Sequence, residues 1–129
     1  MSTPQARILV VEDEPDLLRI VEIYLRRWGF IVDGFIDPLE ALAHFKKNHQ
    51  IHHVVITDIK MPGMTGIEFA IELRKLRPDI KIILMTAFEV MPGDLETMLT
   101  IIKYDELLLK PFKLMEICNA VKRQLQVSG

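Results

Sequence analysis

The chain has 129 residues, of which 50% are hydrophobic and 26% charged, a mixture typical of a globular domain. Its 16 basic and 18 acidic residues leave a net charge of −2, which argues against nucleic acid or an anionic membrane surface as the main partner. No apolar run approaches the ~20 residues that cross a bilayer. The N-terminus lacks a signal-peptide pattern, and the single Cys118 cannot form an internal disulfide. We therefore expect one soluble, cytoplasmic domain over residues 1–129, with its core at about 7–125.

Strand-like apolar stretches alternate with amphipathic, helix-like stretches five times along the chain. This alternation predicts βαβ units and a parallel sheet. The strand-like stretches are apolar throughout rather than at every second residue, as expected when helices cover both faces of the sheet. The sequence therefore predicts the α/β class, with five strands at 7–11, 30–35, 54–57, 81–85 and 107–109.

The ends of the first two predicted helices are marked by proline, glycine and aspartate. Pro15 suits a first helical turn, and Gly29 stands where a left-handed residue ends the helix. Asp37 is placed to cap a second helix over about 38–47, which also begins with a proline. Both helices are thus bounded by residues with a physical reason to be there.

Three more helices are predicted in the second half of the chain. Thr65 and Glu68 have the spacing of a capping box, so a third helix begins there and ends before Pro78. A short fourth helix is expected over 94–102. A fifth is expected over 114–125, where apolar residues recur at helical spacing.

Polar side chains follow four of the predicted strands at their carboxyl ends. Glu12 and Asp13 come after the first strand, Asp58 after the third, Thr86 after the fourth and Lys110 after the fifth. In an open α/β sheet, ligands bind outside the carboxyl ends of the strands, so we expect these side chains to share one crevice. Three carboxylates, one hydroxyl and one ammonium together indicate a metal-assisted phosphoryl site.

The charge of this group of side chains favours a divalent cation. Three carboxylates and one lysine sum to about −2, and two carboxylates about 5 Å apart repel by about 3 kcal/mol at an effective dielectric constant of 20. Mg²⁺ or Mn²⁺ would offset that charge, and Mg²⁺ prefers a shell of hard oxygen ligands. Taken singly, each residue also has an ordinary structural role, such as an acidic start to a helix. Their order on successive strand ends is what favours a common site.

These motifs resemble the receiver domain of bacterial and archaeal response regulators, the CheY-like superfamily. The resemblance rests on Asp58 and the segment 60–66 after it, on the upstream acidic pair, on Thr86 and on the Lys-Pro-Phe of 110–112. It covers about 7–125 and implies one receiver domain with a flavodoxin-like (βα)₅ fold. The implied sheet is doubly wound, with five parallel strands in the order 2-1-3-4-5.

The resemblance also implies a function in two-component signal transduction and phosphorelay. Asp58 would accept a phosphoryl group from a histidine kinase or a phosphotransfer protein, without the chain being an enzyme. Glu12, Asp13 and Asp58 would hold Mg²⁺ or Mn²⁺ together with the backbone carbonyl of Lys60. The family's output surface, formed by the fourth helix, fifth strand and fifth helix, would bind a downstream protein or a second copy of the chain.

The resemblance assigns switch roles near the fourth and fifth strands, where this chain departs from the family. Thr86 and Lys110 would bind phosphoryl oxygens, and Pro111 is a candidate for a cis peptide bond. The aromatic residue that usually swings inward is replaced by Leu107. We expect Leu107 to be buried whether or not the protein is phosphorylated, because leucine has no polar tip to favour solvent. Any surface change would then come from the backbone of 88–93.

Two other functions remain open on the sequence. One is a phosphorylation-independent interaction module, favoured by the altered output surface. The other is a phosphatase with an aspartyl nucleophile, but such enzymes carry a second aspartate two residues after the first, where this chain has Lys60. A metal site made by His52 and His53 is disfavoured, because adjacent residues entering a strand face opposite sides.

Overall fold

The computed structural model describes residues 6–87 and 104–127, and it confirms the predicted α/β class. The strands form one five-stranded parallel sheet in the order β2-β1-β3-β4-β5, as the family resemblance implied. The predicted helix over 94–102 lies outside the described residues. The elements are β1 (Arg7–Val11), α1 (Pro15–Arg27), β2 (Ile31–Phe35), α2 (Pro38–Asn48), β3 (Val54–Asp58), α3 (Gly66–Leu76), β4 (Lys81–Thr86), β5 (Glu106–Leu109) and α5 (Leu114–Val127).

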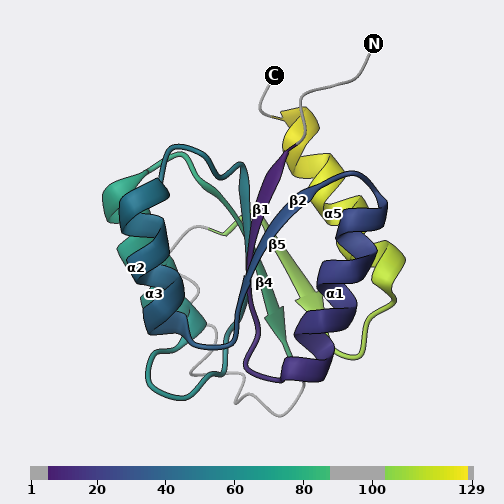
Figure 1. The fold of residues 1–129 in the computed structure, drawn as a ribbon, viewed down its shortest axis with the longest axis horizontal. Coiled ribbons are helices and arrows are strands. Elements are labelled where there is room, and N and C mark those ends of the chain that lie inside the picture. The colour runs from purple at the N-terminus through teal and green to yellow at the C-terminus, as the bar shows by residue number, and fades with distance from the viewer. Residues whose placement is uncertain (1–5, 88–103, 128–129) are drawn as a thin grey trace.

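The helices cover the sheet on both faces, α1 and α5 on one and α2 and α3 on the other (Figure 1). Neighbouring residues of a strand point to opposite faces, so the apolar strands supply two hydrophobic clusters. Along β1, Ile8 and Val10 join the cluster beneath α1 and α5, whereas Leu9 and Val11 join the cluster beneath α2 and α3. The continuous apolar character of the strands therefore follows from burial on both sides.

The helix ends carry the predicted caps. The Asp37 side chain accepts a hydrogen bond of 2.9 Å from the backbone N–H of Leu39 at the start of α2. Thr65 and Glu68 form a complete capping box at the start of α3, with reciprocal bonds of 3.1 and 2.9 Å. Gly29 follows α1 with φ of +94°, the left-handed conformation expected of it.

The strand boundaries place the polar residues at one edge of the sheet. β3 includes Asp58 as its last residue and β4 includes Thr86, each one residue beyond the predicted strand. The carboxyl ends of the parallel strands lie together at the lower edge in Figure 1. Within residues 6–87 and 104–127, no helix has the length and apolar character needed to cross a membrane.

Candidate functional site

Three carboxylates meet at the carboxyl edge of the sheet. Glu12 and Asp13 directly follow β1, Asp58 ends β3, and these two strands are neighbours paired in parallel. One oxygen from each carboxylate lies within 4.8 Å of those of the other two. Oxygen donors so arranged are the kind that Mg²⁺ prefers, so this group fits a divalent cation.

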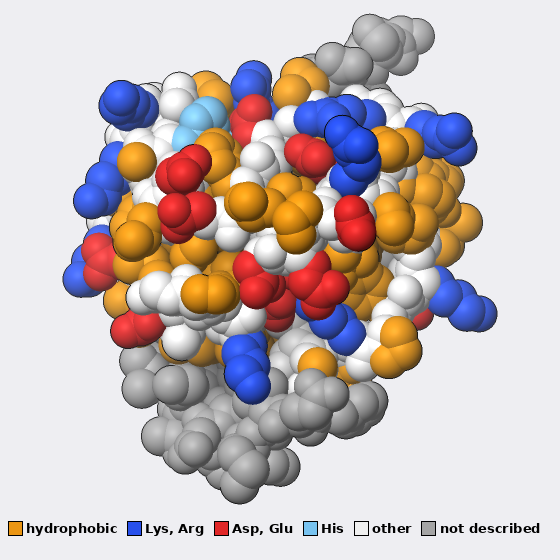
Figure 2. Space-filling model, turned by 60° about the horizontal axis from the view of Figure 1, so that its bottom comes forward, with side chains coloured by type: hydrophobic (Ala, Val, Ile, Leu, Met, Phe, Trp, Pro, Cys, Tyr) orange, Lys and Arg blue, Asp and Glu red, His pale blue; other side chains and the backbone are white. Residues whose placement is uncertain are grey.

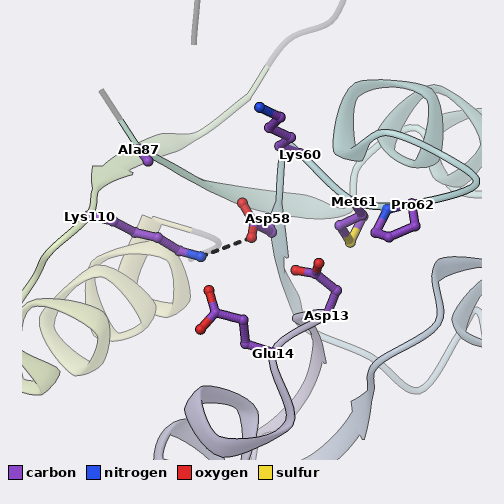
Figure 3. Close-up of a pocket in the computed structure, with 8 residues that line it drawn as sticks. All are labelled: Asp13, Glu14, Asp58, Lys60, Met61, Pro62, Ala87 and Lys110. Atoms are coloured by element: carbon purple, nitrogen blue, oxygen red, sulfur yellow. Dashed lines mark hydrogen bonds and ion pairs between the residues drawn. The ribbon is translucent and has the colours of Figure 1, made fainter. Parts of the chain in front are cut away.

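Lys110, which follows the edge strand β5, forms ion pairs with two of these carboxylates. Its Nζ lies 2.9 Å from Oδ2 of Asp58 and 2.9 Å from Oε1 of Glu12. Figure 3 shows the lysine side chain reaching across to Asp58. Lys110 follows β5 and its backbone N–H donates to the carbonyl of Thr86, so the edge of the sheet fixes the direction of the side chain. The predicted cis peptide bond between Lys110 and Pro111 is present.

Burial controls the ionisation of the site. Glu12 has no exposed surface, and this burial raises the pKa of its carboxyl to about 7, although hydrogen bonds from Lys110 and from the backbone of Glu14 oppose the rise. Burial lowers the pKa of Lys110, but its hydrogen bonds to Asp58 and Glu12 outweigh that and raise it. The lysine is therefore held positively charged between its two partners.

A cavity of about 490 Å³ opens above the carboxylates. In Figure 2, acidic side chains gather near the middle of this end of the molecule, next to basic ones. The side chain of Lys60 points away from the carboxylates in Figure 3. A small anionic group could thus enter beside Asp58 and still reach Lys110. The cavity is lined by Asp13, Glu14, Asp58, Lys60, Met61, Pro62, Ala87 and Lys110.

Thr86 and Leu107, the residues expected to take part in the switch, have different surroundings. Thr86 is buried, and its hydroxyl donates to the carbonyl oxygen of Ala87 at 3.2 Å. Leu107 is half-buried, and it packs against the cluster beneath α2 and α3. The prediction that Leu107 is buried is therefore wrong for this structure, where the residue lies on β5, the edge strand of the sheet. The segment 88–93 lies outside the described residues.

The site thus contains most of the residues expected from the sequence. The prediction did not include the bridge from Lys110 to Glu12, nor the backbone N–H of Glu14, which donates to Oε2 of Glu12 at 3.0 Å. Both contacts depend on the burial of the Glu12 side chain, and the sequence around Glu12 does not predict that burial. Met61 is buried against the cluster beneath α2 and α3, so it packs in the core.

Comparison with known proteins agrees with this fold. Residues 8–122 match the family described as the response regulator receiver domain. The chain is 31% identical to the response regulator receiver protein CpdR of Brucella abortus (strain 2308) over 119 residues, which cover 92% of this chain and 96% of that protein. The chain therefore belongs to the response regulator receiver domain family, whose members are signalling modules of two-component systems.

Other relatives are longer than this chain. The chain is 34% identical to the probable transcriptional regulator ycf27 of Porphyridium aerugineum over 122 residues, covering 93% of this chain and 48% of that protein. It is 36% identical to the transcriptional regulatory protein ZraR of Klebsiella oxytoca over 88 residues, covering 68% of this chain and 19% of that protein. The chain thus spans less than half the length of these two regulators.

Solved structures of receiver domains share the fold. A response regulator receiver domain protein from Clostridium thermocellum superposes with a TM-score of 0.86 at 28% identity, covering 95% of this chain and 96% of that one. The response regulator TrrA from Thermotoga maritima superposes with a TM-score of 0.79 at 37% identity, covering 93% of this chain and 99% of that one. That structure is of TrrA in complex with Mg²⁺-BeF.

Proposed function

We propose that Asp58 accepts a phosphoryl group from the phosphohistidine of a histidine kinase or phosphotransfer protein, in a Mg²⁺-dependent reaction. The observation that carries the proposal is the position of Lys110, whose ammonium lies 2.9 Å from Asp58 beside an open cavity at the carboxyl edge of the sheet. A cation at that point can pair with a phosphoryl oxygen as well as with the acceptor carboxylate. The complex of the relative TrrA with Mg²⁺-BeF supports the same chemistry.

The proposed transfer forms one bond and breaks one. An oxygen of Asp58 attacks phosphorus, the P–N bond of the phosphohistidine breaks, and the imidazole nitrogen leaves with the bonding electron pair. The product is an acyl phosphate on Asp58. Lys110 offsets negative charge on the moving group, and the strand end fixes the acceptor, which suits a reaction governed by positioning and charge.

Glu12, Asp13 and Asp58 would hold the metal, with the backbone carbonyl of Lys60 as a further ligand. Mg²⁺, or Mn²⁺ in its place, supplies the positive charge that lets a dianionic group approach three carboxylates. The buried Glu12 must lose its proton for this role, since its carboxyl has a pKa of about 7. Metal binding and the loss of the Glu12 proton would therefore occur together.

A small acyl-phosphate donor tests the proposal without the cognate kinase. After incubation with Mg²⁺, intact mass should show one phosphoryl group on the wild-type chain and none on Asp58→Asn. Asp79→Asn is the matched control, because Asp79 is exposed and lies before β4, at the opposite edge of the sheet. Equal phosphorylation of the Asp58→Asn variant would refute the assignment.

Thr86 would form the second contact to the phosphoryl group. Its hydroxyl now donates to the carbonyl oxygen of Ala87, and an anionic oxygen is the stronger acceptor. Leu107 has no polar group to follow this movement, so the signal would travel through the backbone of 88–93. Amide chemical shifts with and without beryllofluoride test this route. Large shifts at Leu107 with none over 88–93 would contradict it.

The output partner would bind the surface around β5 and α5, together with the segment 88–103. Three large hydrophobic side chains, Tyr104, Leu109 and Met115, are exposed there. A second copy of this chain could use the same surface and form a homodimer. We further propose that residues 1–129 act as a single receiver domain in the cytoplasm.

Two other functions give different outcomes in the same experiment. A phosphatase would release phosphate rapidly and leave no adduct, but the position of its general acid is taken by Lys60. A phosphorylation-independent module would neither gain mass nor release phosphate. A stable adduct that depends on Asp58 excludes both.

A further inference from the structure

A second cluster of metal-ligating side chains lies away from the phosphoacceptor site. Asp33 in the middle of β2, His44 on α2 and His52 before β3 come together. Oδ2 of Asp33 lies 2.9 Å from Nε2 of His52 and 3.5 Å from Nε2 of His44. One donor atom from each residue lies within 4.8 Å of the other two. Donors bound to one tetrahedral zinc lie about 3.3 Å apart, since each is about 2.0 Å from the ion.

We propose that Asp33, His44 and His52 form a second metal site, for a transition metal such as Zn²⁺. Two imidazoles and one carboxylate favour zinc and its neighbours, whereas the all-oxygen group of the phosphoacceptor site favours Mg²⁺. The two sites would therefore select different ions.

An unpaired, buried nitrogen of His44 supports this site. Among the described residues, Nε2 of His44 and Nδ1 of His52 are both buried and have no hydrogen-bond partner, whereas Nε2 of His52 lies 2.9 Å from Oδ2 of Asp33. Buried polar atoms normally have a partner, so an unpaired imidazole nitrogen beside a carboxylate calls for an explanation. For His44, the unpaired atom is the one nearest Oδ2 of Asp33, and a metal ion there would satisfy it.

Aromatic packing fixes the rings in place. His52 has no exposed side-chain surface, and its ring stacks on Phe45 with centroids 5.8 Å apart and an angle of 24° between planes. His44 packs against Phe35 at 5.1 Å. The ligands therefore lose little conformational entropy on binding, which favours affinity. His53, by contrast, is exposed, and its Nδ1 accepts from the backbone N–H of Arg7.

Arg7 forms an ion pair with Asp33 and should lower the affinity of the site for a cation. Its guanidinium donates to both oxygens of Asp33, at 2.7 Å to Oδ2 and 3.0 Å to Oδ1. It can hold the ligating carboxylate through Oδ1 as an outer-shell partner when Oδ2 turns to the metal. Its positive charge opposes the cation, so we expect weaker binding than at a cysteine-rich zinc site.

Metal titration of the full chain without an affinity tag tests the proposal. The Glu12→Gln/Asp13→Asn background removes the acidic site as a competitor, and Zn²⁺ binding is measured there by calorimetry. We expect one Zn²⁺ per chain, and Co²⁺ in its place should give the visible absorption of a tetrahedral nitrogen and oxygen site rather than an octahedral oxygen site.

Two alanine variants in that background identify the ligands. His44→Ala should weaken Zn²⁺ binding by more than about tenfold, the smallest loss expected even for an outer-shell partner. His49→Ala is the matched control, because His49 ends the same helix outside the cluster, and it should bind zinc like the parent. Asp33→Asn provides a second ligand variant. Equal binding by the His44 and His49 variants, or no binding by the parent, would overturn the proposal.

Discussion

Lys110 serves two carboxylates at once, and this sharing explains how a buried acidic site persists. Its ammonium group lies 2.9 Å from Glu12 and 2.9 Å from Asp58, so both carboxylates have a cationic partner. A buried charge without a partner is strongly destabilising. The sequence predicted a lysine that meets a phosphoryl oxygen. The structure shows that the same lysine bridges the carboxylates of Asp58 and Glu12.

The raised pKa of Glu12 should make Mg²⁺ binding dependent on pH. Below about 7, Glu12 keeps its proton in the metal-free protein, so Mg²⁺ must displace it. We expect the affinity to be nearly constant above about pH 8 and to fall towards tenfold per pH unit below about pH 7. Calorimetry over this range, in two buffers of different ionisation enthalpy, measures both the affinity and the protons released.

Glu12→Gln supplies the control for this pH dependence. Glutamine has nearly the same shape but no proton to lose near neutral pH, so the variant should bind Mg²⁺ weakly and with a flatter pH profile. A wild-type affinity that stays constant down to about pH 6 would show that Glu12 does not carry the competing proton.

Asp58→Asn should not destabilise the metal-free protein. The amide has the shape of the carboxylate but removes one of three crowded negative charges, and Lys110 keeps its bond to Glu12. We expect the free energy of unfolding, from urea titration with a chelator, to be unchanged or higher by about 1 kcal/mol. Asp79→Asn should change it by less than about 0.5 kcal/mol. A clear loss for Asp58→Asn alone would mean that Lys110 depends on that carboxylate for its place.

At the scale of the elements, the backbone at the start of α3 packs in close contact with the end of β3. The backbone N–H of Gly66 donates to the carbonyl of Ile59 at 2.7 Å. A Cβ atom added to Gly66 would lie 2.1 Å from the backbone oxygen of Asp58. Only glycine allows this approach, because the obstacle is backbone and cannot turn aside. The helix thus packs directly against the backbone of Asp58.

Gly66→Ala should therefore affect both stability and function. Relieving the clash requires α3 and the end of β3 to move apart, and overpacking of this kind costs about 1–3 kcal/mol. We expect a lower free energy of unfolding together with slower phosphorylation of Asp58 by an acyl-phosphate donor. Urea titration and intact mass over time measure the two effects.

Gly34→Ala is the matched control on β2. The three atoms nearest to an added Cβ there all belong to the side chain of Glu22, with Oε2 at 2.2 Å, and a side chain that ion-pairs with Arg26 can move more easily than backbone. The variant should lose less stability than Gly66→Ala and should be phosphorylated at the wild-type rate. If the two variants were phosphorylated equally fast, the close approach at Gly66 would have no bearing on the acceptor.

The elements were predictable where a residue has a specific local cause. Pro15, Asp37, the Thr65 capping box and Gly29 mark helix ends that the structure reproduces within a residue or two. Strand ends were less certain, since nothing in the sequence separates the last paired residue from the first residue of the loop. Asp58 illustrates this, because it belongs to β3 and not to the loop after it.

The grouping of Glu12, Asp13, Asp58 and Lys110 was predictable because these residues lie at corresponding strand ends. The second cluster was not, since Asp33, His44 and His52 come from a strand, a helix and a loop with no shared motif. One signal was present in the sequence: Asp33 interrupts an apolar strand, and a charged residue there needs buried partners. The half-buried Leu107 was missed because burial at a sheet edge depends on elements that pack across it.

At the scale of the whole molecule, the site joins elements from both ends of the chain, so a bound metal should stabilise the entire fold. Mg²⁺ at about 100 times its dissociation constant should add about 2.7 kcal/mol to the free energy of unfolding, because it binds only the folded state. Thermal unfolding with increasing Mg²⁺ measures this as a rising midpoint temperature.

The Glu12→Gln/Asp13→Asn variant separates site binding from general salt effects. It keeps the fold elements but loses two metal ligands, so its midpoint should barely respond to Mg²⁺. Holding the ionic strength constant at every Mg²⁺ concentration removes charge screening as a cause. A rise of equal size in both proteins would show that the stabilisation does not come from the acidic site.

The bond between Lys110 and Glu12 spans 98 residues of sequence, and this has a consequence for synthesis on the ribosome. The three carboxylates are made in the first half of the chain, long before the lysine that offsets them. Domains fold as units as the chain emerges, so β1 and β3 await the edge strand β5 before the lysine is in place. A chain interrupted before residue 110 lacks the lysine of the proposed acceptor site, so we expect such fragments to take up no phosphoryl group from an acyl-phosphate donor.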